Sequence, residues 1–112
     1  MKPTLYHIVS PEWWAEFSDL DYYESETLSV EKFIHLSTSG QVQGTLNNYF
    51  VGKAQLLLLH LDMDKLNAEL RFETVRNADT FPHLYGRLNK DAILKVEELL
   101  PNPDGTFPFT AK

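Results

Sequence analysis

The sequence predicts an α+β domain in which two helices accompany a mixed or antiparallel sheet. Five or six short segments alternate apolar and polar residues with the period of two typical of β-strands, and two segments have the helical period. Several of the strand-like segments follow one another with no helix between them, which disfavours a doubly wound parallel sheet. Because 112 residues suit one core, we assign residues 1–112 to a single domain.

The composition is that of an ordinary globular protein, and it excludes several classes of function. The net charge of -6 leaves no basic surface for phosphates, so we expect no extended nucleic-acid binding. Without cysteine, the chain has neither disulfides nor cysteine-type zinc sites. The N-terminus has no apolar signal core, and the longest apolar run, Leu56 to Leu59, is too short to span a bilayer. We therefore expect a cytoplasmic protein with no membrane partner.

The first strand and the first helix are both marked near the N-terminus. Alternation over Thr4 to Val9 places His7 on one face together with apolar neighbours. Ser10 suits a helix cap, and Pro11 suits the first helical position after it. The helix is expected to pack on the core through apolar residues that recur at i, i+4 and i+7, namely Trp13, Phe17 and Leu20.

A loop, a second strand and a second helix are predicted next. The acidic stretch from Asp19 to Lys32 has no clear period, so we expect a solvated loop and keep it as a candidate lid. The segment Phe33 to Ser37 alternates like a strand, and Thr38 and Gln41 then match a capping box. The helix is expected to run to about residue 51, with four residues facing inward, namely Val42, Leu46, Tyr49 and Phe50.

The second half of the chain is expected to be mainly strands. The most apolar segment, Ala54 to Leu61, should be central in a sheet. Leu70 to Thr74 is a short strand that leads into a polar loop over Val75 to Thr80. A last strand over Asp91 to Leu100 precedes a turn, and the tail from Thr106 to Lys112 is expected to be loosely held.

The segment from Phe81 to Gly86 is the strongest local indication of a functional site. It places His83, a side chain that titrates near neutral pH, two residues from the donor Tyr85. Because His7 and His35 occur in similar strand contexts, we expect these three histidines to converge in one cleft. We expect His60, near the end of an apolar strand, to lie outside that cleft.

Three kinds of chemistry remain open for this cluster. Three imidazoles with Glu73 could bind a metal, although no pair has a local metal-ligand spacing. Ser37 could act as a nucleophile with a histidine base, although no nucleophile elbow is present. Neutral His and Tyr side chains could instead hold ribose hydroxyls while an aromatic ring stacks on a base. In its strand Glu73 faces away from Leu70 and Phe72, which should pack inward, so it reaches a cleft only if its own face of the sheet lines that cleft.

Four motifs in order carry a resemblance to a known family. They are Leu5-Tyr6-His7-Ile8, Phe33-Ile34-His35-Leu36-Ser37-Thr38 with Gln41, Leu70-Arg71-Phe72-Glu73, and Phe81-Pro82-His83-Leu84-Tyr85-Gly86 with Leu88. Over residues 4 to 99 the chain resembles the small bacterial family called domain-of-unknown-function family 952, which is grouped by fold with the ADP-ribosyltransferases. The resemblance implies a compact ADP-ribosyltransferase-like α+β fold, with small sheets around a cleft for NAD.

The resemblance also implies roles for individual residues. His7 would hold the ribose of the nicotinamide half, and His35 occupies the strand whose aromatic residue, often Tyr, packs on nicotinamide. Glu73 would contact the ribose and stabilise an oxocarbenium-like transition state, as carboxylates do in glycosyl transfer. The chain differs from that group in having His35 in place of Tyr and in lacking an Arg-Ser-Glu signature.

These inferences together predict a small enzyme that acts on NAD or on an NAD-derived or ADP-ribosylated substrate. We expect His7, His35 and Glu73 to be catalytic, with no metal and no prosthetic group, and NAD as a possible substrate. The ligand-binding residues would be Ser37, Thr38, Gln41, His83 and Tyr85. The partner would be a small nucleotide ligand, while the acceptor and the oligomeric state are not specified. The alternatives are a non-catalytic nucleotide-binding module on the same fold and a histidine-based metal-dependent hydrolase.

Overall fold

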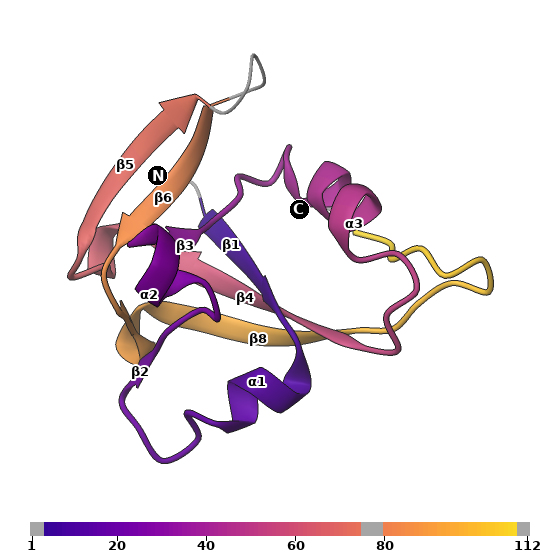
Figure 1. Cartoon of the computed structure of the whole chain (residues 1–112), viewed down its shortest axis with the longest axis horizontal. Helices are drawn as coiled ribbons and strands as arrows, with labels where there is room; N and C mark the ends of the chain where they lie inside the picture. Colours follow the sequence, from indigo (N-terminus) through magenta and orange to yellow (C-terminus); the bar gives the residue numbers. More distant parts are fainter. Residues whose placement is uncertain (1–3, 75–79, 110–112) are drawn as a thin grey trace.

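The computed structural model describes residues 4–74 and 80–109 of the chain. In these residues eight strands, three short α-helices and two 3-10 helices form a compact α+β fold, and every strand pair is antiparallel (Figure 1). The predicted fold class is therefore confirmed at this level, with more elements than the sequence indicated. No helix in the described residues is long and apolar enough to cross a membrane.

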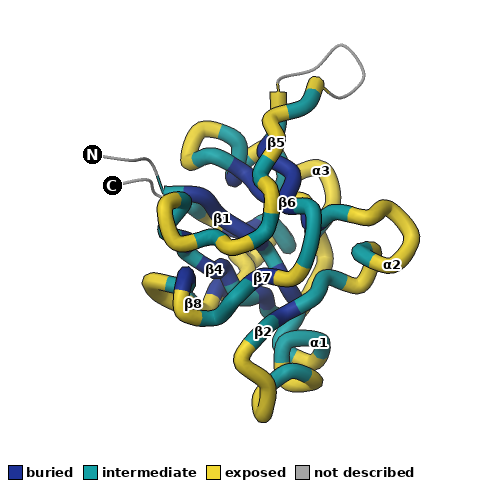
Figure 2. Tube along the Cα trace, turned by 90° about the vertical axis from the view of Figure 1, so that its left-hand side faces the viewer, coloured by how far each residue is buried: buried dark blue, intermediate teal, exposed yellow. Residues whose placement is uncertain are grey.

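The first sheet has the order β1-β4-β8 and contributes the largest share of the core. Its strands are β1 (Thr4–Val9), β4 (Leu56–Asp62) and β8 (Ile93–Leu99). The central strand β4 is the apolar segment predicted for that place, and four of its leucines are at most 1 % exposed because both faces of the strand are covered. Figure 2 shows the buried residues gathered along β1, β4 and β6, with exposed residues on the surrounding loops.

Helix α3 (Val42–Tyr49) and the chain that follows β8 cover one face of this sheet. Only half of the predicted capping box forms, because the Thr38 N–H donates to Gln41 Oε1 at 3.0 Å while the helix begins at Val42. The inward position predicted for Tyr49 is wrong, since 74 % of that residue is exposed. The prediction of a loosely held tail is also wrong up to residue 109. Phe107 is 1 % exposed, because it packs in the core cluster that contains Val42 and Leu46 of α3.

The second sheet has the order β3-β6-β5 and contains the segment singled out in the sequence. Its strands are β3 (Ile34–His35), β6 (Thr80–Tyr85) and β5 (Glu69–Thr74). The Phe81 to Gly86 segment is thus the central strand of a sheet, and it ends at Gly86, whose φ of 146° is a conformation that favours glycine. The predicted strand Phe33 to Ser37 is only two residues long, but Ser37 pairs with Tyr6 of β1 and so links the two sheets.

The two faces of the second sheet differ in composition. Ile34, Leu84 and Leu70 point to the main core between the sheets. The other face carries histidine, tyrosine and carboxylate side chains, which the next subsection describes. The inward position predicted for Phe72 is wrong, because Phe72 is 51 % exposed near the end of an edge strand.

The stretch predicted as a solvated loop contains two ordered elements. These are β2 (Tyr22–Tyr23), which pairs with β7 (Leu88–Asn89), and helix α2 (Leu28–Glu31). Tyr23 is 1 % exposed, because it packs in the main core. The 3-10 helices η1 (Met63–Lys65) and η2 (Lys90–Ala92) contact each other beside this pair.

The first helix is correctly predicted at its start and too long at its end. In α1 (Pro11–Ala15) the Ser10 hydroxyl accepts a hydrogen bond from the Trp13 N–H, as expected for a cap. The helix stops after five residues, so Leu20 is 40 % exposed instead of packing on the core. Of the predicted polar loop over 75 to 80, residues 75–79 lie outside the described residues, and Thr80 begins β6.

Candidate functional site

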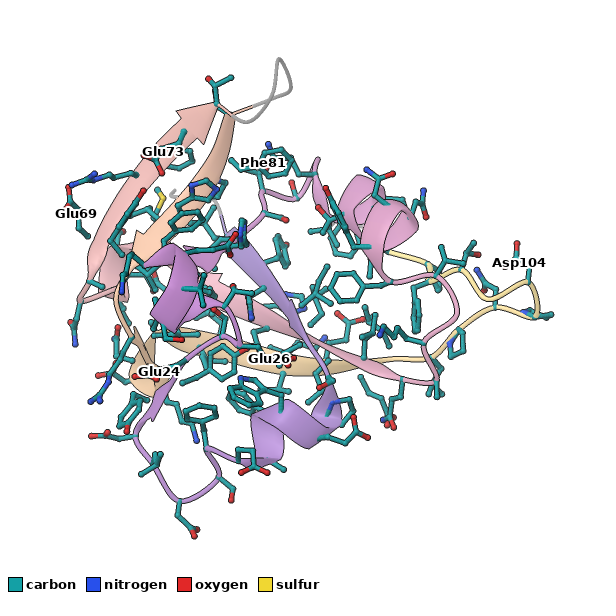
Figure 3. All side chains as sticks on the ribbon, in the orientation of Figure 1. Glu24, Glu26, Glu69, Glu73, Phe81 and Asp104 are labelled. Atoms are coloured by element: carbon teal, nitrogen blue, oxygen red, sulfur yellow. The ribbon has the colours of Figure 1, made fainter. Side chains whose placement is uncertain are left out.

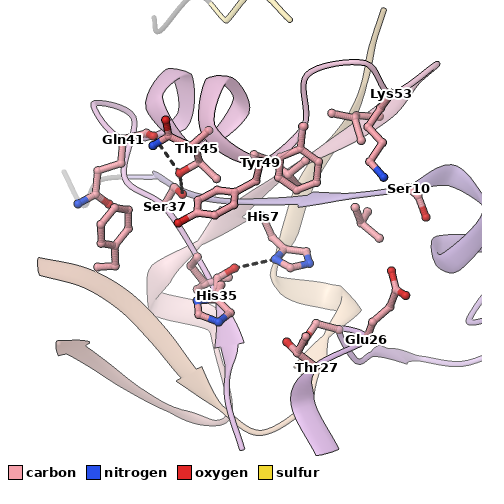
Figure 4. A pocket seen from close by; sticks show the side chains of 18 of the residues that line it. His7, Ser10, Glu26, Thr27, His35, Ser37, Gln41, Thr45, Tyr49 and Lys53 are labelled. Atoms are coloured by element: carbon pink, nitrogen blue, oxygen red, sulfur yellow. Dashed lines mark hydrogen bonds between the residues drawn. The ribbon is translucent and has the colours of Figure 1, made fainter. Parts of the chain in front are cut away.

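A cleft of about 1090 Å³ opens where β1, β3 and β6 meet the start of α3 and the chain around α2. The three predicted histidines, His7, His35 and His83, all line it, so they converge as expected. In the close view of the cleft, Lys53 and Ser10 lie toward one end and Gln41 toward the other (Figure 4). His60 is not among the residues that line the cleft.

His7 is held by the protein at both ring nitrogens. Its Nδ1 lies 2.7 Å from the carbonyl oxygen of His35, which can only accept, so Nδ1 carries the proton. Nε2 therefore accepts from the Tyr23 hydroxyl at 2.9 Å. Burial lowers the pKa of His7 from 6.5 to about 4, so the ring is neutral at pH 7. His7 thus ties β1 to β2 and β3, and no ring nitrogen is left free for a ligand.

His83 is held at one ring nitrogen only. Its Nδ1–H donates to Glu73 Oε1 at 2.8 Å, and the Tyr85 hydroxyl donates to the same oxygen at 2.6 Å. These two bonds, that from Tyr85 first, lower the pKa of Glu73, so the carboxylate is ionised. The Phe33 ring stacks on the His83 imidazole with centroids 4.1 Å apart and 19° between the planes. The carboxylate and the stacked ring together fix the orientation of the imidazole.

Glu73 and Tyr85 are not among the residues that line the cleft. Glu73 pairs with Phe81 across β5 and β6, and Phe81 lines the cleft whereas Glu73 lies on the outer strand (Figure 3). Glu73 therefore contacts the cleft-lining His83, and its predicted role at a ligand stays a prediction. Tyr85 likewise reaches the site only through Glu73, whose hydrogen bond raises the pKa of the Tyr85 hydroxyl.

His35 lies at the mouth of the cleft, with 53 % of its side chain exposed. Its Nε2–H donates to Glu31 Oε1 at 2.8 Å. A hydrogen bond from the Thr27 side chain, followed by that from His35, lowers the pKa of Glu31. The His35 and His83 rings meet edge to face with centroids 5.2 Å apart, which places His35 over the ring of His83.

Two buried side-chain atoms in the described residues have no hydrogen-bond partner, and both belong to residues that line the cleft. They are His83 Nε2 and Ser25 Oγ. Leaving a buried polar group unpaired costs roughly 1–3 kcal/mol, so such atoms call for a water or a ligand. Since the Nδ1 edge of His83 is turned to Glu73, the opposite Nε2 edge is the one available to the cleft.

The remaining predicted ligand residues lie at the start of α3. Ser37 Oγ is 3.4 Å from Thr45 Oγ1, which donates to the Gln41 carbonyl (Figure 4). The Gln41 side chain is engaged with the Thr38 N–H and the Thr80 carbonyl, so it ties β6 to this turn. Ser37 and Gln41 line the cleft, whereas Thr38 does not. Ser37 has no hydrogen bond to a histidine among the described residues, so a serine–histidine pair is not formed.

Sequence reasoning missed four residues that shape the site, namely Tyr23, Ser25, Glu31 and Phe33. The i, i+4 spacing of Glu31 and His35 was a usable signal for one pair. Tyr23 and Ser25 lie in an acidic stretch without a period, where no sequence pattern indicates burial. The metal alternative lacks a ligand set, because the described residues contain no group of three or more His, Asp or Glu that could hold an ion.

The fold and the cleft define a small α+β protein with a histidine-lined cavity, and comparisons place it in a family. The chain belongs to the family described as "Protein of unknown function (DUF952)", whose model matches residues 8–96. The chain is similar to protein CC0527 from Caulobacter crescentus, known from crystal and solution structures. The crystal structure is 31% identical with a TM-score of 0.85, covering 94% of this chain and 93% of that one. The solution structure has a TM-score of 0.79, covering 92% and 90% of the two chains. Curated proteins include no match to this chain.

Proposed function

We propose that this protein is an enzyme that breaks the N-ribosyl bond of NAD or of an NAD-derived or ADP-ribosylated substrate. The observation that carries the proposal is His83, whose Nδ1 is held by Glu73 at 2.8 Å while its buried Nε2 has no partner at the cleft. An imidazole oriented by a carboxylate, with its other nitrogen free, is the arrangement of a general base. The substrate class rests on the resemblance to the ADP-ribosyltransferase group.

The proposed reaction is a displacement at the anomeric carbon of the ribose. The proton of a water or of an acceptor hydroxyl passes to His83 Nε2 as its oxygen bonds to that carbon. The N-glycosidic bond breaks, and its electron pair leaves with the base, so a pyridinium base departs as the neutral amide-bearing ring. Glu73 steadies the imidazolium that forms, and it is a positioning residue because it touches His83 and not the substrate.

The other cleft residues would serve binding and the exclusion of water. Tyr23 keeps lone pairs free to accept from a hydroxyl, since its own proton goes to His7. His35 covers His83 from the solvent side. This departs from the roles that the resemblance implies for His7 and Glu73, because both are engaged with protein partners in the structure.

The test measures release of nicotinamide from NAD, and of ADP-ribose from an ADP-ribosylated peptide, by the full chain. We expect His83→Gln to lower kcat by roughly a hundredfold or more, as for loss of a general base. His60→Gln is the matched control, because His60 also contacts a glutamate, Glu97, through its Nε2 at 2.8 Å and lies outside the cleft. Equal turnover in His83→Gln and wild type would remove His83 from the mechanism. No turnover in the wild type, with ligand affinity intact, would favour the non-catalytic binding module.

A further inference from the structure

The charged residues that line the cleft are mostly negative. Glu12, Glu26 and Glu31 line it, and Lys53 is the single lysine or arginine among the lining residues that the structure describes. The N-terminus of α3, where Gly40 and the N-cap Gln41 just before the helix line the cleft together with Gly44 of its first turn, adds about half a positive charge. A pyrophosphate with two negative charges would therefore meet more repulsion than attraction.

Three ring side chains of the cleft have their N–H or O–H directed to a protein partner and can offer lone pairs to a ligand. His83 and His35 each donate one ring N–H to a carboxylate, so in the neutral ring the second nitrogen is a lone pair. The Tyr23 hydroxyl donates to His7, so it too offers only lone pairs. Acceptors in these fixed positions are complementary to the hydroxyl groups of a sugar and repel the oxygens of a phosphate.

One of these acceptors is buried and unpaired, which is an independent indication of a ligand. His83 Nε2 has no hydrogen-bond partner, and only 5% of the His83 side chain is exposed. Ser25 Oγ, also unpaired, lies in the segment next to Glu26. A ligand that satisfies both must bring a hydrogen-bond donor into the acidic, acceptor-rich part of the cleft.

We infer that the ligand of this cleft is a riboside with a neutral or positively charged base and at most one phosphate, and not a dinucleotide. This inference rests on the proposed function, which supplies the ribosyl group, and it narrows the substrate to the NAD-derived class. The sugar hydroxyls meet the lone pairs of Tyr23, His83 Nε2 stays available to the attacking water, and the base lies beside the carboxylates. A single phosphate is matched by Lys53 and the start of α3.

The experiment is a calorimetric titration of the full chain with nicotinamide riboside, nicotinamide mononucleotide and NAD at low salt. We expect NAD to bind about tenfold more weakly than the riboside, as when one or two exposed charge contacts become repulsive. Glu26→Gln should reduce the difference in affinity between NAD and the riboside, because it removes one repulsive carboxylate. Lys53→Met should lower the affinity for the mononucleotide and leave the affinity for the riboside unchanged. Glu97→Gln, a carboxylate outside the cleft, is the control and should leave the order unchanged.

NAD affinity equal to or tighter than that of the riboside in the wild type would overturn the inference, as would the binding of none of the three probes. The result is separable from the test of catalysis. The expected affinity order without turnover leaves the ligand assignment standing and removes the enzymatic proposal. Turnover of NAD by a protein that binds NAD most tightly supports the enzymatic proposal and removes the ligand assignment.

Discussion

The His83–Glu73 pair and the His60–Glu97 pair have the same local chemistry in two different sheets. In each pair an imidazole N–H, Nδ1 in His83 and Nε2 in His60, donates at 2.8 Å to a glutamate on the neighbouring strand. In each, the glutamate is paired with the residue two positions before the histidine, namely Phe81 and Leu58. The pairs are thus diagonal neighbours on one face of an antiparallel ladder. Their contact alone does not separate a functional pair from a structural one.

The surroundings of the free ring nitrogen separate the two pairs. The His83 side chain is 5% exposed and stacked on Phe33, and its free Nε2 is buried without a partner at the cleft. The His60 side chain is 19% exposed and meets Tyr6 edge-on, and it has no buried unpaired nitrogen. A histidine–carboxylate pair therefore indicates a site when its second nitrogen is buried, unpaired and beside a cavity.

The largest effect that distinguishes the pairs should be on turnover. On the proposed function, Glu73→Gln lowers kcat by roughly a hundredfold or more, because the imidazolium loses its ionised partner. KM should change little, since Glu73 does not line the cleft. Glu97→Gln should leave both constants unchanged. The measurement is steady-state release of the free base by each variant and the wild type.

A loss of folded molecules would also lower kcat and leave KM unchanged, so rescue by a conservative variant is needed to exclude it. A Glu73→Gln protein that is merely less well folded would lose active molecules, and Glu73→Asp would not recover the rate. We expect Glu73→Asp to recover part of it, because a carboxylate is restored on the same strand. Equal losses in Glu73→Gln and Glu97→Gln would show that the two pairs are equivalent and that the comparison has no functional content.

A second effect concerns His7, which differs from both pairs in having no carboxylate partner. Its pKa falls from 6.5 to about 4 on folding. Between these two pH values the unfolded chain therefore binds a proton at His7 that the native ring does not bind. Stability should therefore be full above pH 6.5 and decline as the pH falls toward 4, by up to about 3 kcal/mol. The measurement is the free energy of urea unfolding between pH 7.5 and 4.5.

The window above pH 4.5 isolates this histidine from the carboxylates, whose ordinary pKa values lie at or below its lower end. His60→Gln should retain the decline, and His7→Gln should flatten it. If His7→Gln does not fold, the ring protons of His7 in the wild type can be followed by NMR. Titration of that ring near pH 6.5 would contradict the expected burial effect.

The strands that alternate clearly were predictable, whereas the site's connections were not. Thr4 to Val9 has the bounds expected from alternation, and the apolar β4 is central, because burial on two faces leaves a continuous hydrophobic run. The three histidines could be grouped because each lies in or beside an apolar strand. Their partners depend on strand order and register, which put Glu73 beside His83 and not in the cleft.

Short elements account for most of what the sequence did not predict. Strand β2 and helix α2 have two and four residues, too few for a period to be recognised. Tyr23 lies in this stretch among acidic neighbours, yet it is buried because its ring packs in the main core and its hydroxyl bonds to His7. Local propensity cannot anticipate a tyrosine whose burial depends on a contact sixteen positions away.

The smallest expected effect is a difference in stability between variants of two tyrosines, Tyr23, which bonds to His7, and Tyr85, which bonds to the Glu73 partner of His83. Tyr23→Phe should lower the free energy of unfolding by about 1–3 kcal/mol, because it leaves the buried His7 Nε2 without a donor. Tyr85→Phe should leave stability nearly unchanged. The Glu73 carboxylate, with 37% of its side chain exposed, keeps its bond to His83 and gains water in place of the phenol. Urea unfolding at pH 7.5 measures both variants. A larger loss in Tyr85→Phe would mean that the Glu73 network stabilises the fold as the His7 network does. The unpaired nitrogen of His83 would then be all that distinguishes it from His60.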